Sequence, residues 1–220
     1  MRLSTDACRA ALATGLVGLT GVASAASITT FNTPSEYFAA LTNPTVLAFE
    51  APALGTVFPE GSGFSGITFT DFPDETFGGL ITDQFAAFGN QSLTVDRDGE
   101  FSDFFFEGES FSVAFDAPVN AVGLFFNILP SDDVEDFLFI STPVGDAFGG
   151  GADPVGITSF FFVGLISDTP FSSATFGSTL DAPGGFNVDD LSFQVVPIPG
   201  ALWLLAGGLL ALTTQRRKGG

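Results

Sequence analysis

Short runs of apolar and β-branched residues, separated by clusters of Gly, Pro, Asp and Asn, recur along most of the chain. In Gly66–Phe72 apolar and polar residues largely alternate, which is typical of a strand with one buried face. The predicted strands are Thr45–Glu50, Gly66–Phe72, Ser92–Arg97, Phe101–Glu107, Ser110–Phe115, Ala121–Leu129, Asp136–Thr142, Ile157–Ser167, Phe171–Thr179 and Phe186–Val196. Short strands at this spacing indicate an all-β fold, a two-sheet sandwich of jelly-roll type.

Turn residues and one short helical pattern complete this prediction. The dipeptide Asp98-Gly99 predicts a hairpin, and Asp116–Pro118 predicts a turn between two of the strands. Pro34 begins the one segment with helical spacing, Ser35–Leu41, in which Tyr37 and two further apolar residues share a face.

Two runs, Phe104–Phe106 and Phe160–Val163, are apolar on both faces of a strand. The pattern predicts strands that are covered on both sides or lie at the edge of the core. The alternative is an exposed aromatic platform for sugar rings. Such platforms usually use Trp and Tyr, and the chain has one of each.

The N-terminus has the pattern of an export signal. Cationic residues precede the apolar run Ala10–Val22, and Ala23 and Ala25 provide the small-x-small pattern that signal peptidase requires. Residues 1–25 are therefore predicted to be a helical signal peptide.

The C-terminus combines two prolines, Pro197 and Pro199, with an apolar run Ala201–Leu212 and a cationic end at Arg216 and Arg217. A membrane-spanning helix needs ~17 to 25 apolar residues, so this segment is marginal. The cations favour a cytoplasmic position for the end of the chain. We predict a membrane helix within a tail of residues 197–220, and a plain C-terminal anchor is the alternative.

This order of Pro-x-Pro, short apolar helix and Arg-rich end resembles the PEP-CTERM sorting tail, with Ile198 in place of the family's acidic residue. The resemblance implies an exosortase-type membrane protease as a partner, which cuts near the Pro motif. It also implies transient anchoring in the inner membrane of a Gram-negative bacterium, followed by delivery to the cell surface or to an extracellular matrix rich in exopolysaccharide.

The segment between the two ends, residues 26–196, has the size of one domain. The chain has no His, and its one Cys, Cys8, lies in the predicted signal peptide. The domain therefore has no Ser-His-Asp or Cys-His nucleophile, no zinc site of the usual ligands, no haem and no iron–sulfur cluster. Carboxylates are the side chains that remain for any catalysis or metal binding.

The chain has a formal net charge of −19, and Arg97 is the only Lys or Arg in the segment 26–196. So acidic a domain repels nucleic acid and anionic membranes, which excludes nucleic acid as a partner. Two explanations for the charge stay open: solvation in salty surroundings, or binding of Ca²⁺, whose preferred ligands are carboxylate oxygens.

Three carboxylates are candidate calcium ligands. Glu50 closes the first predicted strand of the sheets, and Asp189 and Asp190 lie in the last. Because the first and last strands of a jelly roll are commonly neighbours, these residues are expected to meet at one rim. Adjacent strand residues point to opposite faces, so one aspartate at most faces inward, where it needs a cation. The alternative is an acidic strand end in water.

The sequence around these acids also resembles calcium-stabilised jelly-roll carbohydrate-binding modules. The shared parts are the Phe49-Glu50 opening and the closing Asp-Asp-Leu-Ser-Phe of residues 189–193. In those modules carboxylates from both termini hold a structural ion. Two other acidic segments are weaker candidates: Asp96–Glu100 lacks the spacing of an EF-hand, and 131–136 is an acidic loop that is either solvated or ion-loaded.

The chain is predicted not to be an enzyme. Two acids ~5 to 9 Å apart in a cleft would suffice for a glycosidase, but among so many acids some pair meets any distance rule by chance. The leading hypothesis is an exported, non-enzymatic β-sandwich with a structural or adhesive role in contact with exopolysaccharide. A calcium-stabilised carbohydrate-binding module is the second hypothesis, and a glycoside hydrolase is the third.

Overall fold

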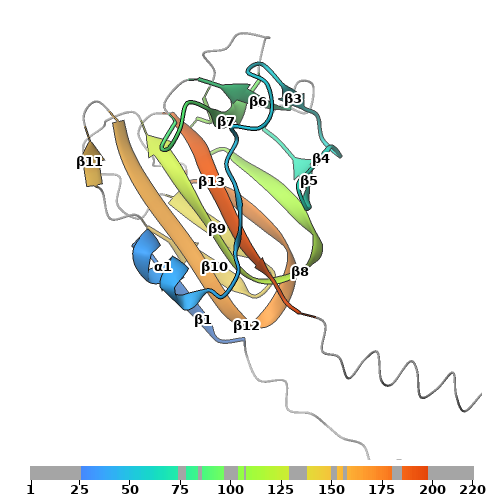
Figure 1. The fold of residues 1–220 in the computed structure, drawn as a ribbon, viewed down its shortest axis with the longest axis vertical. Coiled ribbons are helices and arrows are strands. Elements are labelled where there is room, and N and C mark those ends of the chain that lie inside the picture. The colour runs from blue at the N-terminus through green and yellow to red at the C-terminus, as the bar shows by residue number, and fades with distance from the viewer. Residues whose placement is uncertain are drawn as a thin grey trace, which may run out of the picture.

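The computed structural model describes residues 26–73, 78–83, 86–96, 104–106, 108–128, 138–149, 153–155, 158–179 and 185–197. These residues are mostly strand, with one short helix (Figure 1). The elements are β1 (Ile28–Phe31), α1 (Pro34–Ala40), β2 (Thr45–Leu47), β3 (Val57–Phe58), β4 (Gly63–Phe64), β5 (Ile67–Asp71), β6 (Gly79–Thr82), β7 (Ser92–Val95), β8 (Ser110–Ile128), β9 (Leu138–Thr142), β10 (Gly145–Phe148), β11 (Asp153–Val155), β12 (Thr158–Ser178) and β13 (Phe186–Val195). The predicted predominance of strands is confirmed, and α1 lies within one residue of the predicted helix.

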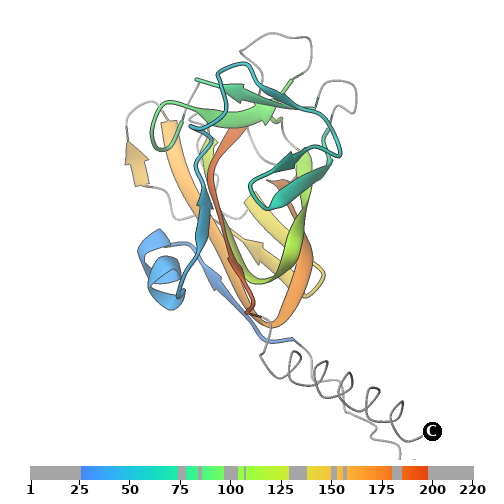
Figure 2. The same cartoon turned by 45° about the vertical axis from the view of Figure 1, so that its right-hand side comes forward.

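The strands form one connected antiparallel sheet rather than two separate sheets. The main path runs β10-β9-β12-β8-β13-β7-β6-β3. On its flanks β1 and β11 pair with β12, β2 pairs with β13, and β5 joins β4 to β8. Figure 2 shows how strongly β8, β12 and β13 curve, so that the sheet wraps around its own interior.

The predicted turn at Asp116–Pro118 is wrong, because β8 continues through it. The neighbouring strand β12 likewise joins the two strands predicted at 157–167 and 171–179. The two long strands pair on both sides of the bend, but the register shifts between Ile166 and Ser173. Irregularities of this kind let paired strands bend sharply without separating. The turn residues therefore mark a corner of the sheet.

Other short strands were not predicted, namely β1, β3, β4, β6, β10 and β11. Each has only two to four residues, which is too short for an alternating pattern to stand out. The strand predicted at Thr45–Glu50 ends earlier, at Leu47. The hairpin predicted at Asp98-Gly99 lies outside the described residues.

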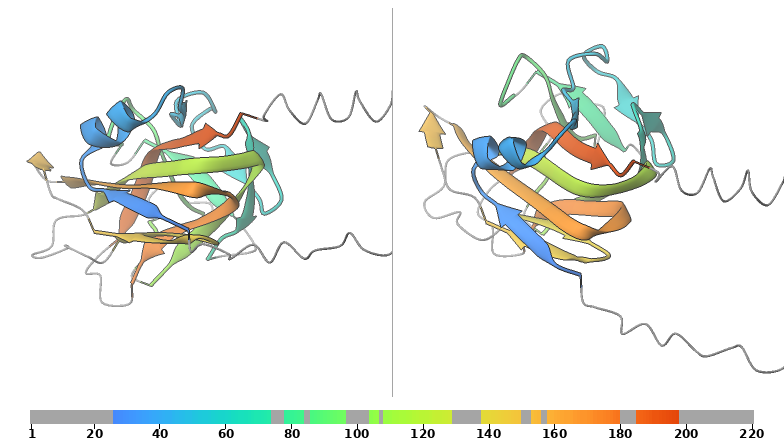
Figure 3. Two further views of the ribbon diagram at one scale, coloured as in Figure 1. Left: turned by 90° about the horizontal axis from the view of Figure 1, so that it is seen from below. Right: turned by 60° about the horizontal axis from the view of Figure 1, so that its bottom comes forward.

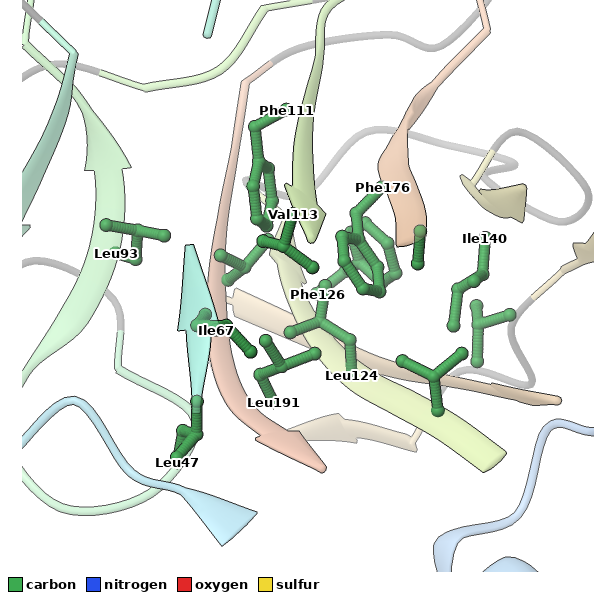
Figure 4. Close-up of a cluster of buried hydrophobic side chains, with 14 of the residues drawn as sticks. Leu47, Ile67, Leu93, Phe111, Val113, Leu124, Phe126, Ile140, Phe176 and Leu191 are labelled. Atoms are coloured by element: carbon green, nitrogen blue, oxygen red, sulfur yellow. The ribbon is translucent and has the colours of Figure 1, made fainter. Parts of the chain in front are cut away.

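Aromatic rings from distant parts of the chain fill the interior of the curved sheet (Figure 4). Phe111 on β8 stacks on Phe72, Phe105 and Phe176, with ring centroids 6.1, 5.3 and 5.1 Å apart. Offset aromatic pairs add about 0.5–1.5 kcal/mol each to the effect of area burial. This aromatic packing stabilises the interior of the sheet.

A second, smaller cluster lies on the opposite, outer face of β8 and β12. It consists of Tyr37, Ala121, Phe125 and Phe162, whereas the adjacent Phe161 belongs to the main core. The strand that contains the run Phe160–Val163 is therefore covered on both faces, as predicted. In the run Phe104–Phe106, Phe105 is fully buried but Phe106 is 50% exposed.

Helix α1 covers part of the outer face of the sheet (Figure 3). The ring of its residue Tyr37 packs in the outer cluster, over a depression between β8 and β12. The depression exists because Gly123 and Gly164 are paired directly across β8 and β12. A Cβ atom at Gly123 would lie 3.0 Å from the Tyr37 ring, and one at Gly164 would lie 2.8 Å from it. The two glycines therefore make room for the chain's single tyrosine.

The phenol group of Tyr37 is fully buried. Burial raises the pKa of this hydroxyl above its ordinary range, and the nearby Ser192 hydroxyl lowers it in part. Within the described residues no atom completes a well-formed hydrogen bond to the Tyr37 Oη atom. The residue thus docks α1 through its ring.

Candidate functional site

The structure brings Glu50, Asp189 and Asp190 to the same part of the sheet. Strand β2 pairs with β13 through Leu47 and Leu191, which places the segment that follows β2 beside the two aspartates. The charge of Glu50 is close enough to Asp190 to raise the pKa of its carboxyl, an effect second to burial. The prediction that Thr45–Glu50 and the last strand are neighbours is confirmed, although only Thr45–Leu47 of the predicted strand is a strand in the structure.

A β-bulge sets the direction of the two aspartates. Asp189 lies opposite Phe125, and Ser192 lies opposite Gly123, so β13 has one residue more than β8 over this interval. Asp190 has a left-handed backbone, with φ of 46°, a conformation that aspartate tolerates better than most residues. In a regular strand Asp190 would take the core position opposite Leu124. The bulge gives that position to Leu191 and leaves Asp190 half-exposed.

Asp189 is buried, with 1% of its surface exposed, but it does not lie in the main core. Its partner Phe125 belongs to the outer cluster, so Asp189 lies on the outer face beneath residues 86–91. Its Oδ2 atom accepts a hydrogen bond from the Phe88 N–H at 3.0 Å, and its Oδ1 atom accepts one from the Asp190 N–H at 2.8 Å. The buried charge thus has backbone partners.

The pKa of Asp189 is raised to about 7: burial is the main cause, backbone N–H hydrogen bonds partly oppose it, and the charge of Asp190 adds to it. Near neutral pH this carboxyl therefore exists in both protonation states.

Glu50 binds the second half of the segment 86–91. Its Oε1 atom accepts hydrogen bonds from the N–H groups of Asn90 and Gln91, at 2.7 and 2.8 Å. Gly89 has a φ of 70°, and a Cβ at this position would lie 2.3 Å from Glu50 Oε1. Only glycine therefore lets the backbone approach the carboxylate this closely.

We call residues 86–91 the Phe88 loop, because its most exposed large side chain is Phe88 (52% exposed). The Phe88 ring contacts Phe125 edge-to-face, with centroids 4.8 Å apart. The sequence analysis missed this loop, since neither Phe88 nor its anchors form a local motif. The Gly-Asn pair at 89–90 was the one available sign of a turn.

Two of the three acids, Glu50 and Asp189, accept hydrogen bonds from the Phe88 loop. Glu50 and Asp190 are neighbouring charges. In the described part of the chain no group of three or more His, Cys, Asp or Glu residues is arranged to hold a metal ion. The oxygens that accept backbone hydrogen bonds still have lone pairs for a cation. Calcium at Glu50, Asp189 and Asp190 stays a prediction.

The predicted processing residues lie mostly beyond the described residues. Ala23, Ala25, Pro199, Arg216 and Arg217 fall outside them, whereas Pro197 is exposed directly after β13. Over the described residues the structure has no helix long and apolar enough to cross a membrane. The predicted signal and membrane helices lie outside this part of the chain.

No protein-family model and no curated protein matches the chain. Among solved structures, the chain is similar to two structures of the catalytic domain of a GH87 alpha-1,3-glucanase in complex with tetrasaccharides. The first is 13% identical with a TM-score of 0.32 and covers 78% of this chain but 28% of the other. The second is 14% identical with a TM-score of 0.32 and covers 67% and 30%. The chain thus spans less than a third of these proteins, and so low a TM-score supports no conclusion about fold or function.

Proposed function

We propose that the chain is an exported, non-enzymatic protein of the cell surface or extracellular matrix, associated with exopolysaccharide. Its β domain, of sandwich and jelly-roll type, is the structural or adhesive part. The observation that carries this proposal is that the described domain begins and ends at one corner of its sheet.

Both ends are held at the bend of β8 and β12. Near the start, the Ser27 N–H donates to Asp168 Oδ1 at 3.0 Å, and the Asp168 N–H donates to the Ser27 carbonyl at 3.1 Å. Near the end, the Val196 N–H donates to the Pro118 carbonyl at 2.9 Å. Asp168 and Pro118 are the bend residues of the two paired strands.

This arrangement suits a domain that is held from one end. The predicted signal peptide ends just before β1, and the predicted sorting tail starts just after β13. In Figure 1 the start of β1 and the end of β13 lie at the bottom, whereas β3, β6 and β7 lie at the top. A tail held in the inner membrane, and later cut by an exosortase-type protease, would leave β3, β6 and β7 pointing outward.

The use of the acids supports a non-enzymatic role. Glu50 and Asp189 both accept hydrogen bonds from backbone N–H groups of the Phe88 loop. A catalytic acid pair in a glycosidase must instead face a sugar across a cleft. A glycoside hydrolase is therefore the weakest of the three hypotheses, and turnover of a panel of glycosides by the purified protein would establish it.

The test of export and processing is mass spectrometry of the native protein from separated cell fractions. We expect an N-terminus at Ala26, a C-terminus near Pro197, and recovery from the surface or matrix. Replacing both Arg216 and Arg217 with Ala should leave uncut protein in the membrane fraction. Recovery of the wild type from the cytosol with both ends intact would contradict the proposal.

A calcium-stabilised carbohydrate-binding module is the second candidate, favoured by the proximity of Glu50 and Asp190. A bound Ca²⁺ would relieve the repulsion between the two carboxylates. Thermal melts in millimolar Ca²⁺ and in chelator test this candidate, with Asp190→Asn as the variant and Glu60→Gln as a control of equal charge change. The candidate would be supported if Ca²⁺ raised the melting midpoint of the wild type and of Glu60→Gln but not that of Asp190→Asn. Equal wild-type midpoints in Ca²⁺ and in chelator would rule out the calcium site.

A further inference from the structure

Phe88 is one of several half-exposed apolar side chains, and it differs from those on strands in that side chains rather than strand pairing hold its backbone. An isolated exposed Leu or Val on a surface is ordinary. The Phe88 loop, in contrast, is fixed by Asp189 on one side and by Glu50 on the other, and these residues lie 101 and about 40 positions away in the sequence. A ring that is half-exposed on a backbone fixed in this way is presented to the solvent.

The Phe88 loop adjoins two acidic side chains. Glu50 is exposed and Asp190 is half-buried, and both adjoin the anchors of the Phe88 loop. Burial raises the pKa of Asp190, and the nearby charge of Glu50 raises it further. Every Lys and Arg of the chain lies outside the described residues, so no described side chain brings a balancing positive charge.

We propose that Phe88, Glu50 and Asp190 form a contact site for an amine-bearing sugar unit of a polysaccharide. The apolar face of the sugar ring would lie on Phe88, and its ammonium group would lie beside the two carboxylates. Charged N–H donors bind carboxylates more strongly than neutral ones do, and cations are attracted to aromatic faces. This inference rests on the proposed association with exopolysaccharide and names the class of sugar.

Charge and size favour this ligand over two others. A polysaccharide with carboxylate or sulfate groups would be repelled by Glu50, Asp190 and the net charge of −19. A basic protein surface is less suitable, because a stable protein interface buries about 800 Å² on each partner. One exposed ring on a loop that adjoins two acids matches a single saccharide unit. Repetition along a polymer would then raise the overall affinity.

The test is calorimetric titration of the purified full-length protein with two probes, a glucosamine hexamer and its fully N-acetylated counterpart, at low salt and with chelator. We expect the glucosamine hexamer to bind at least tenfold more tightly, and its affinity to fall as salt is added. Equal affinities for the two hexamers would overturn the proposal, because the amine would then make no contribution.

Two pairs of variants locate the site. Phe88→Ala should weaken binding of the glucosamine hexamer about tenfold, whereas Leu54→Ala, which truncates another half-exposed side chain, should not. Asp190→Asn should weaken it similarly, whereas Glu60→Gln should not. Asparagine tolerates the left-handed backbone of Asp190, so this variant is expected to fold. Unchanged binding in Phe88→Ala and Asp190→Asn, with wild-type melting temperatures, would overturn the proposal.

Competition experiments separate the remaining alternatives. In one experiment polylysine competes with the glucosamine hexamer. If polylysine binds the wild type and Phe88→Ala equally well, and more tightly than the hexamer does, the acids would instead be the site of a basic protein partner. Hexamer binding that requires Ca²⁺ would assign them to a metal site. Either result would overturn the amine-sugar site. Neither would bear on surface delivery, which the cell-fraction experiment tests separately.

Discussion

Two segments cover the outer face of β8, β12 and β13, and they are held there by opposite kinds of interaction. The N-terminal arm, residues 26–47, is held mainly by strand pairing at both ends and by the Tyr37 ring above two glycines, with one hydrogen bond from the Ser27 N–H to the Asp168 carboxylate. The Phe88 loop is held mainly by two carboxylates that accept its backbone N–H groups.

The difference has a physical consequence. Apolar packing depends little on pH or salt, whereas a buried carboxylate depends on its protonation state. The N-terminal arm should therefore behave as a permanent cover of the sheet. The Phe88 loop should respond to conditions and to ligands. Four predictions test this contrast.

The largest effect is expected for Tyr37→Ala. Removing a fully buried aromatic ring leaves a cavity above Gly123 and Gly164 and should cost about 3–5 kcal/mol of unfolding free energy. Urea unfolding followed by circular dichroism measures it, at both low and high salt. The neighbouring Phe38→Ala is the control and should cost less, since Phe38 is only half-buried. Equal losses would show that the glycine depression has no special role.

The next effect is a dependence of stability on pH through Asp189. Its folded pKa of about 7 lies above the ordinary aspartate pKa of 3.8, so the folded state binds the proton more tightly than the unfolded state does. The stabilisation that comes from protonated Asp189 is fully present below about pH 4. It is lost as the pH rises through 7, and the free energy of unfolding falls by up to roughly 4 kcal/mol.

Chemical unfolding across this pH range, with chelator present, measures the effect. The variant Asp189→Asn should lack this component, whereas Tyr37→Ala should retain it. A wild type and an Asp189→Asn variant with parallel pH profiles would contradict the role given to this carboxyl.

Gly164→Ala should have an intermediate effect. The added Cβ would lie 2.8 Å from the Tyr37 ring, and overpacking of this kind costs about 1–3 kcal/mol. The added Cβ would also lie 2.8 Å from the Phe162 ring. In the double variant Gly164→Ala, Tyr37→Ala the two losses should therefore be less than additive, because only the clash with Tyr37 disappears with its ring. Strict additivity in a double-mutant cycle would mean that the two residues do not interact.

The smallest effect is expected for Glu50→Ala, which removes the acceptor of the Asn90 and Gln91 N–H groups. Because the loop is exposed and water can replace the carboxylate, the loss of stability should be about 1 kcal/mol. Amide hydrogen exchange should accelerate at Asn90 and Gln91, whereas the arm amide of Tyr37 should keep its protection. Glu60→Ala is the control, and uniform acceleration in both segments would contradict the contrast.

Much of the fold was predictable because it depends on local patterns. Alternating apolar residues identified β5, Pro34 and the helical spacing around Tyr37 identified α1, and the run at 160–163 correctly indicated a strand covered on both faces. The bend of β8 was read as a turn, since the same turn residues serve for a reversal of the chain and for a corner in a continuous strand. Only the pairing with β12 distinguishes the two.

The candidate site shows the same division. That Glu50 lies near Asp189 and Asp190 followed from the order of the strands. The β-bulge, the burial of Asp189 on the outer face and the role of the Phe88 loop did not follow, because each depends on a register or on contacts between residues far apart in the sequence.

The sequence by itself determined the predominance of strands, the acidic character and the absence of imidazole and thiol chemistry from the domain. These properties follow from composition and local periodicity. Only the tertiary structure decided which carboxylates are buried, which ring is presented and where the two ends of the domain meet. Those features arise from long-range pairing, in which a shift of one residue moves a side chain to the other face of the sheet.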